Sequence, residues 1–210
     1  MSANWTSRDL DIVETLARRV RLVPLVLIKR IWWGGTASDR TVLDRLKLLV
    51  QGRLIHRSVV NLRSIAVHKP IWAWRPGERE PDFERLSRRA RERWPGVAEP
   101  TAVFWATKLA ANLFGSTAGR LPDLDHRDHD VLLAQVYAWY RTERPDQAQR
   151  WLGEDALPKA GYRLKDPDAF LVADDGRPLR VIESAGHYGS RQVESFHEHC
   201  REYDLPYELW

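Results

Sequence analysis

Apolar side chains recur every three to four positions in three successive segments near the beginning of the chain. This spacing predicts amphipathic helices over residues 7–18, 24–33 and 36–51, because positions three and four apart share one helix face. Glycines follow the second and third segments, and Thr36 or Ser38 can cap the third. The apolar stripe of the third helix consists of Val42, Leu43, Leu46, Leu49 and Val50.

Two segments rich in β-branched and aromatic residues come next. The stretches "RLIHRSV" (53–59) and "PIWAWRP" (70–76) predict two strands joined by a basic loop. Three helices followed by strand, loop and strand is the order of a winged helix, in which the third helix reads DNA and the loop is the wing. The same order occurs in protein-interaction modules, which remain the alternative interpretation.

The predicted DNA-binding surface combines the polar face of the third helix with the wing. Arginine reads guanine or holds a phosphate, and a threonine hydroxyl does either more weakly. We therefore expect Arg40 and Arg45 to contact bases or backbone near the start of the helix. The full predicted set is Ser38, Arg40, Thr41, Arg45 and Lys47 from the helix, and Arg57, Arg63 and Lys69 from the wing.

Charge divides unevenly along the chain. The first 95 residues hold 20 Lys and Arg against 10 Asp and Glu, whereas the remainder hold 13 against 19. A basic front half favours a polyanion, most simply nucleic acid, as its partner. With one cysteine, no apolar run near the roughly 20 residues of a membrane span and no apolar signal core, we expect a reduced, cytoplasmic protein with no membrane partner.

The rest of the chain predicts alternating helices and strands. A charge-rich helix covers 78–98 and can act as a connector, as part of the DNA footprint or in dimerisation, and a strand and a short helix follow within 101–115. The later pattern is then helix, three strands, helix and strand, over 128–141, 150–154, 168–172, 178–184, 190–203 and 206–210.

This α-β-β-β-α-β order is that of the PD-(D/E)XK nuclease core. The sequence therefore predicts an α/β (α+β) fold with an N-terminal winged helix-turn-helix. We expect a winged-helix DNA-binding domain at 1–77, a linking helix at 78–98 and a nuclease-like domain at 99–210.

The second and third of these strands raise the question of a metal site. A type I′ turn at Asp175-Gly176 would set Asp168 directly opposite Glu183, with Cβ atoms about 5 Å apart. Two carboxylates at that separation repel unless a cation lies between them, and Mg²⁺ prefers such oxygens. Alternatively, Asp168 only opens a strand after Pro167, and Glu183 forms a salt bridge with a nearby arginine, Arg180 or Arg191.

One residue departs from the nuclease pattern. The motif requires a basic residue two positions after the glutamate, and Ala185 stands there. Such a lysine would orient the attacking water and stabilise charge on the phosphate. The nearby substitutes are Lys165, His187, Arg191 and Gln192. Ala185 makes cleavage the less favoured expectation, so no catalytic residue is assigned and Mg²⁺ is expected only if Asp168 and Glu183 form an active site.

The histidines suggest two further possibilities. His197 and Cys200 are three residues apart on a predicted helix and could converge on zinc, but a single cysteine is thin support and Cys200 lies on the apolar face. His129 or Asp130, near the start of the 128–141 helix, could approach the hairpin carboxylates, although capping by Asp128 and Asp130 is the simpler interpretation.

The order of the whole chain resembles the replication-relaxation family of bacterial mobile-element proteins. The resemblance is carried by "HRDHDVLLAQVYAWY", "PDAFLV", "VIESAGHYG" and "FHEHCREYDLPYELW", after a winged-helix order. It implies a protein that binds double-stranded DNA in plasmid or transposon replication or transfer, with a nuclease-like second domain. A homodimer and other replication or transfer proteins are compatible partners. The alternatives are a metal-dependent DNA endonuclease and a winged-helix transcriptional regulator.

Overall fold

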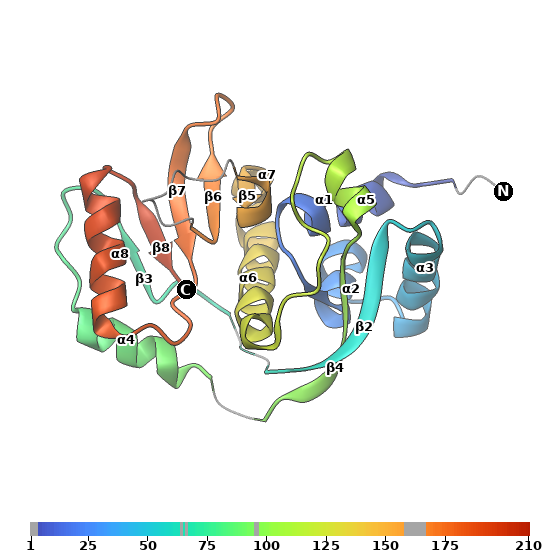
Figure 1. Cartoon of the computed structure of the whole chain (residues 1–210), viewed down its shortest axis with the longest axis horizontal. Coiled ribbons are helices and arrows are strands. Elements are labelled where there is room, and N and C mark those ends of the chain that lie inside the picture. Colours follow the sequence, from blue (N-terminus) through green and yellow to red (C-terminus); the bar gives the residue numbers. More distant parts are fainter. Residues whose placement is uncertain (1–3, 64, 66, 95–96, 158–166) are drawn as a thin grey trace.

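Two β-sheets lie on either side of a long central helix, α6 (Leu124–Glu143), in this computed structural model (Figure 1). The structure describes residues 4–63, 65, 67–94, 97–157 and 167–210. Within these residues the fold is mixed α and β, with eight α-helices and a three-stranded and a five-stranded sheet. No helix within this part of the chain is both long enough and apolar enough to cross a membrane.

The first sheet has the strand order β1-β4-β2, and both pairings are antiparallel. Four helices accompany it, and each predicted N-terminal helix is present. The strands are β1 (Val23–Pro24), β2 (Ile55–Leu62) and β4 (Glu99–Ala106), and the helices are α1 (Ser7–Arg18), α2 (Leu25–Trp33), α3 (Asp39–Gln51) and α5 (Lys108–Leu113). Ser38 caps α3 as predicted, because its Oγ accepts a hydrogen bond from the Thr41 N–H.

The second sheet has the order β3-β8-β7-β6-β5, with β7 and β8 parallel and the other pairs antiparallel. One face packs on α6, and the other packs on α4 and α8. The elements are β3 (Trp72–Trp74), α4 (Phe83–Glu92), α7 (Pro145–Gln149), β5 (Trp151–Gly153), the 3-10 helix η1 (Glu154–Ala156), β6 (Ala169–Val172), β7 (Pro178–Glu183), α8 (Ser190–Glu202) and β8 (Tyr207–Leu209). The predicted order of helices and strands after residue 128 is therefore present.

The expected second strand of the wing was wrong. Residues 70–76 do form a strand, β3, but it pairs with β8 at the edge of the second sheet. The partner of β2 is β4, which pairs with it along its whole length from Ile55 opposite Ala106 to Leu62 opposite Glu99. The segment between them, 63–98, is consequently an excursion to the second sheet, and the strand pairing crosses the expected boundaries after residues 77 and 98.

A single apolar cluster connects the two sheets through α6. Phe104 of β4, Tyr137 and Tyr140 of α6, Trp151 of β5 and Ile182 of β7 are all buried in it. Aromatic rings account for much of this contact, since the Trp151 ring meets both tyrosines edge-on at 5.5 and 5.4 Å. The helix therefore holds the two sheets in one arrangement.

The turn between β6 and β7 is not the predicted type I′ turn. That turn requires a positive φ at both central residues, whereas of Asp175 and Gly176 only Gly176 has one, at 82°. The Gly176 N–H instead donates to the Ala173 carbonyl at 2.9 Å, and Ala173 N–H donates to the Arg177 carbonyl. The turn is one residue longer than predicted, which by itself would shift the strand register.

A second irregularity restores that register. Val172 pairs with Pro178 but Leu171 pairs with Arg180, so β7 carries one extra residue at this point. Beyond it, Ala169 lies opposite Ile182, which is the register that the predicted turn would have given. The expected juxtaposition of the two hairpin carboxylates is therefore right, although its predicted cause was wrong.

Candidate functional site

Each hairpin carboxylate accepts a main-chain hydrogen bond from the opposite side of the hairpin, where β6 begins and β7 ends. The Ser184 N–H donates to Asp168 Oδ2 at 2.6 Å, and the Asp168 N–H donates to Glu183 Oε2 at 3.3 Å. The side chain of Asp168 is 12% exposed, and Glu183 is buried at 1%. Both groups are thus held by main-chain donors at the open end of the hairpin.

A histidine from α6 lies against Asp168. His129 Nε2 is 3.1 Å from Oδ1 and 3.2 Å from Oδ2 of Asp168, and its Nδ1 is 3.4 Å from Oδ1 of Asp130. Burial lowers the pKa of His129, but the nearby charges of Asp168 and Asp130 outweigh this and raise the pKa to about 10. His129 is therefore the positive neighbour of Asp168 and Asp130, and it does not occupy the position between Asp168 and Glu183 where a metal ion was expected.

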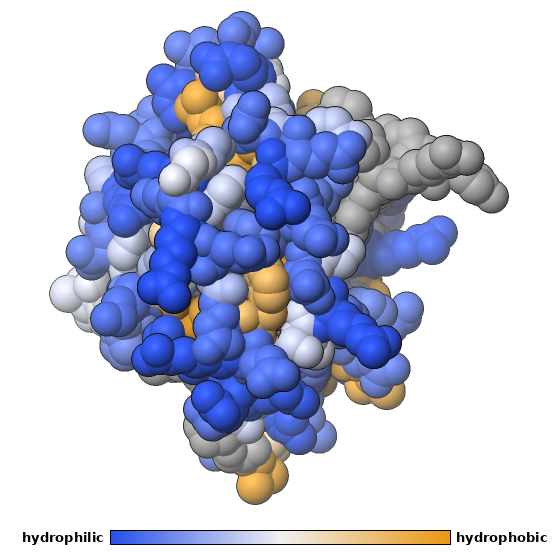
Figure 2. Space-filling model, turned by 90° about the vertical axis from the view of Figure 1, so that its left-hand side faces the viewer, coloured by the Kyte–Doolittle hydropathy of each residue, from blue (hydrophilic) through white to orange (hydrophobic). Residues whose placement is uncertain are grey.

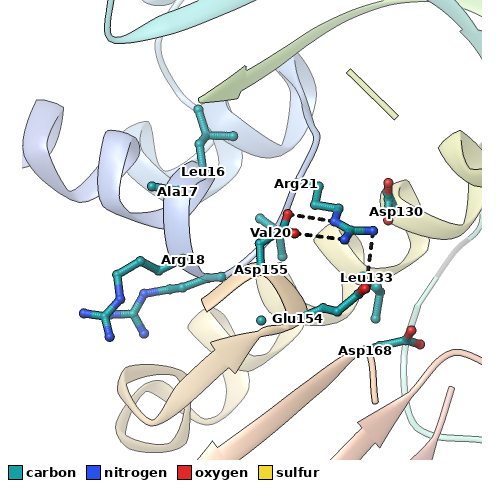
Figure 3. A pocket seen from close by; sticks show the side chains of 12 residues that line it. Leu16, Ala17, Arg18, Val20, Arg21, Asp130, Leu133, Glu154, Asp155 and Asp168 are labelled. Carbon is teal, nitrogen blue, oxygen red and sulfur yellow. Dashed lines mark hydrogen bonds and ion pairs between the residues drawn. The ribbon is translucent and has the colours of Figure 1, made fainter. Parts of the chain in front are cut away.

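Arg21 pairs with two further carboxylates, Asp155 and Glu154, in the pocket that Asp130 and Asp168 also line. It donates two hydrogen bonds to Asp155, at 2.8 and 2.9 Å, and its Nη1 is 3.1 Å from Glu154 Oε2. Figure 3 shows the guanidinium between these two acidic residues, with Asp130 and Asp168 lying further along the same pocket. The hydrogen bonds to Asp155 raise the pKa of Arg21 above its ordinary value.

The Glu183 carboxylate borders a second pocket on the α8 face of the sheet. This pocket has a volume of about 490 Å³. Its lining comprises Pro167, Phe170, Val181, Glu183, Tyr188, Arg191, Gln192, Ser195, Phe196, His199, Cys200 and Leu205. The Tyr188 hydroxyl donates to Glu183 Oε1 at 2.6 Å, and burial beside Glu183 raises the pKa of Tyr188. The tyrosine is therefore a neutral hydrogen-bond donor to the carboxylate.

The position of the motif lysine is part of the core. Ala185 is fully buried in the apolar cluster between the sheet, α4 and α8, and its N–H donates to the Trp210 carbonyl at 2.7 Å. Of the expected substitutes, His187 is exposed and stacks on Trp94 with ring centroids 5.3 Å apart. Arg191 and Gln192 line the α8 pocket, and Lys165 lies outside the described residues.

The proposed salt bridge between Glu183 and Arg180 was wrong. Arg180 points to the α6 face, where its Nη1 is 2.7 Å from Glu208 Oε1. Glu208 is buried and also receives hydrogen bonds from Arg144 and Tyr140, at 3.0 and 2.6 Å. Arg180 therefore belongs to a structural network in the core.

The oxygens that were expected to hold a metal ion take part in other contacts. The oxygens of Asp168 and Glu183 already accept the hydrogen bonds described above, and no group of three or more His, Cys, Asp and Glu side chains in the described part of the chain could hold a metal. The zinc interpretation also lacks support, because His197 Nδ1 is 3.0 Å from the Tyr207 hydroxyl and Cys200 is buried in the core.

The polar face of α3 is open to solvent. The Arg40 side chain is 92% exposed, and its nearest ion-pair partner is Asp44 at the weak separation of 4.0 Å. Thr41 and Lys47 are exposed as well, and the Ser38 and Thr41 hydroxyls are 2.9 Å apart. Four of the five residues predicted on this helix thus share an accessible surface.

Arg45 does not belong to this surface. Its guanidinium forms a close two-point ion pair with Asp9 of α1 and also donates to the Asn4 carbonyl at 3.2 Å. Asp9 is fully buried and completes a capping box with Thr6 at the start of α1. Its guanidinium is therefore occupied within the protein, where it joins α3 to α1, and the structure does not place it on the exposed face with the other predicted residues.

The three residues predicted on the wing are not brought together. Arg57 is exposed on β2, whereas Arg63 follows the end of that strand, where its N–H donates to Asp128 at 3.0 Å. Lys69 lies further on, in the connection to β3 and close to α4. The strand that pairs with β2 is β4 and not β3, so of these three residues only Arg57 lies on the two-stranded ribbon that β2 and β4 form.

Comparisons with family models, with curated proteins and with solved structures find no match to this chain.

Proposed function

We propose that this protein binds double-stranded DNA through α3, in the manner of a winged helix, and that its second sheet is a nuclease-like fold retained without cleavage. The observation that supports DNA binding is the exposed polar face of α3, where Arg40 is almost fully exposed and has only a weak ion pair with Asp44. Phosphate contact and base reading both need cations that are free to leave water for DNA.

The surroundings of α3 support this proposal. Helix α2 precedes it after a short turn at Gly34 and Gly35, both of which have positive φ, and this helix, turn and helix order is compatible with a helix-turn-helix. Val42, Leu46 and Leu49 are buried, which turns the opposite face outward. The ribbon of β2 and β4 follows directly and carries the exposed Arg57.

The order of α6, β5, β6, β7, α8 and β8 supports the nuclease-like interpretation of the second sheet. A parallel β8 beside an antiparallel β5-β6-β7 meander is compatible with that core. The proposal that it does not cleave rests on Ala185, which is buried where a catalytic lysine is needed. A role in plasmid or transposon replication or transfer is the corresponding biological proposal.

A binding assay with matched variants tests the DNA proposal. Fluorescence anisotropy measures the affinity for a labelled random-sequence duplex at about 50 to 200 mM salt. The affinity should fall steeply as the salt concentration rises, because contacts with phosphates dominate non-specific binding. Arg40→Ala and Lys47→Ala should each weaken binding about threefold to tenfold. Glu194→Ala, an exposed change on α8, serves as the control. Equal affinity of all variants would remove α3 as the binding surface.

The endonuclease alternative has its own test. Supercoiled plasmid is incubated with Mg²⁺ or Mn²⁺ and with the wild type, Asp168→Ala or Glu183→Ala. We expect no nicking by any of the three. Nicking by the wild type that both substitutions abolish would establish the nuclease and overturn the non-catalytic proposal.

A further inference from the structure

A basic pocket lies between the connection that leads into β3 and the C-terminal end of α4. Its volume is about 340 Å³. Its lining comprises His68, Lys69, Pro70, Ile71, Arg89, Glu92 and Arg93. Three of these side chains are cations at neutral pH and one is a carboxylate, so the pocket has a net positive charge.

The two arginines of this pocket have no carboxylate partner within the described residues. Arg89 donates from Nη1 to the Ile71 carbonyl at 3.3 Å. Arg93 Nε and Nη2 are buried and form no hydrogen bond. Burial lowers the pKa of Arg93 to about 10, and the charge of Arg89 contributes to this shift. A guanidinium in this state destabilises the protein unless an anion approaches it.

The pocket is built on a fixed support. Helix α4 packs against α8 through buried Leu86 and Ala90, and the Ser87 hydroxyl donates to the Tyr188 carbonyl at 2.8 Å. At its end, Trp94 Nε1 donates to the Gly186 carbonyl at 3.2 Å. Because the middle of α4 and a residue just after its C-terminal end are both bonded to the loop before α8, the helix that carries the arginines is held in place before any ligand arrives.

We propose that this pocket binds a phosphate group, with Arg93, Arg89 and Lys69 as its ligands. Arginine forks match the geometry of phosphate oxygens, and a phosphate would supply the hydrogen-bond acceptors that Arg93 lacks. The face that carries α4 and α8 is covered mainly by hydrophilic side chains (Figure 2), which suits a charged partner. A free phosphate and a nucleic-acid backbone offer the same chemistry.

The DNA backbone is the source that the proposed function suggests, and that part of the inference rests on it. The α3 surface and α4 lie toward opposite ends of the molecule, with the β2–β4 ribbon between them (Figure 1). A phosphate contact at α4 would therefore be a second DNA contact, at a distance from the one proposed for α3. The excursion 63–98 would then carry a DNA contact in place of a wing loop.

The first experiment measures duplex affinity for Arg93→Met, Arg89→Gln and Lys69→Gln. Each should weaken binding about threefold to tenfold, and Arg93→Met should lower the slope of log affinity against log salt by about one. Arg88→Gln, an exposed change on the same helix that does not line the pocket, should change affinity less than twofold. Thermal unfolding should show Arg93→Met at least as stable as the wild type, because the substitution removes an unpartnered buried charge. If Arg93→Met does not fold, the duplex affinity of Lys69→Gln, a change at an exposed residue, tests the pocket instead.

The second experiment separates the two sources of phosphate. Inorganic phosphate is exchanged for chloride at constant ionic strength while thermal unfolding is followed. Stabilisation of the wild type but not of Arg93→Met or Lys69→Gln, with duplex affinity unchanged in these variants, would support the pocket with free phosphate as its ligand. No effect of the pocket variants in either experiment would overturn the proposal. Loss of duplex binding in the α3 variants alone would leave the proposed function standing without the pocket.

Discussion

The exposed face of α3 and the cluster beside β6, formed by Asp168, Asp130 and His129, differ in how closely their charged side chains are paired. On α3, Arg40 stands in solvent with only a weak partner at 4.0 Å. In the cluster, His129 lies within 3.4 Å of both Asp168 and Asp130, and Arg21 is saturated by Asp155 and Glu154. Charges that are already matched within a protein hold the fold, and unmatched ones remain available for a ligand.

The same difference separates two arginines on one helix. Arg40 and Arg45 have the same residue type and both lie off the apolar stripe of α3, yet Arg45 is bound to the buried Asp9. Its counter-charge comes from α1, 36 residues earlier. Residue type alone therefore does not distinguish an exposed arginine from one in a structural ion pair; the tertiary partner does.

The largest expected effect comes from placing the lysine of the nuclease motif at position 185, within the apolar cluster between the second sheet, α4 and α8. Ala185→Lys should destabilise the protein by about 3 kcal/mol or more, because it places an ammonium in a packed apolar site. Urea unfolding measures this, and Ala73→Lys on the exposed side of β3 is the control. A variant that kept wild-type stability and nicked plasmid with Mg²⁺ would contradict the assignment of residue 185 to the core.

Removing the matched cation should have the next largest effect. His129→Leu leaves Asp130 and Asp168 without their positive neighbour, so we expect a loss of about 3 kcal/mol in the free energy of unfolding at pH 7. His126→Leu changes an exposed residue on the same helix and should alter stability by less than about 0.5 kcal/mol. Equal stability of the two variants would show that the cluster does not depend on His129.

The contribution of the Asp9–Arg45 pair to the free energy of unfolding should depend on pH. Burial opposes ionisation of Asp9, but hydrogen bonds from Arg45 and Thr6 prevail and lower its pKa from 3.8 to about 2. A carboxylate whose pKa is lower in the folded state stabilises the protein above its unfolded pKa, and that contribution is lost as pH falls through its folded pKa.

Asp9→Asn should accordingly be less stable than the wild type by about 2 kcal/mol at pH 7. The gap should close between pH 3.8 and about 2. Chemical unfolding across this pH range measures it, with Asp44→Asn as the control. A gap that stayed constant down to pH 2 would mean that the charge of Asp9 does not contribute.

The smallest effect is expected from Asp44 itself. This exposed carboxylate sits one turn after Arg40 and adds negative charge to the proposed DNA surface. Asp44→Asn should strengthen duplex binding about twofold and leave stability within about 0.5 kcal/mol of the wild type. Weaker binding of this variant would argue against DNA lying over this face.

Local patterns in the sequence predicted the helices and strands well but their partners poorly. Helical periodicity placed α1, α2 and α3, and the Ser38 cap placed the start of α3, because these signals lie within or next to the segment itself. The segment 70–76 was also identified as a strand, yet nothing in its residues specifies β8 rather than β2 as its neighbour. Strand pairing over such distances depends on how the whole core packs.

The candidate site shows the same limit. The facing of Asp168 and Glu183 was predicted from turn chemistry, and it holds only because an extra residue in β7 offsets the longer turn. The approach of His129 to Asp168 spans 39 residues and left only a weak signal, the proximity of "HRDHD" to a predicted helix start. The unpartnered state of Arg93 could not be predicted, because many exposed arginines have the same local sequence surroundings.

The excursion of residues 63–98 also determines how this protein can be divided. The chain leaves the first sheet after β2, supplies β3 to the second, and returns as β4. A fragment ending at residue 77 would lack the strand that covers β2, and a fragment beginning at 99 would lack the strand that covers β8. The two halves are interlaced rather than modular, so neither can be transplanted or lost by a single cut of the gene without exposing a bare sheet edge.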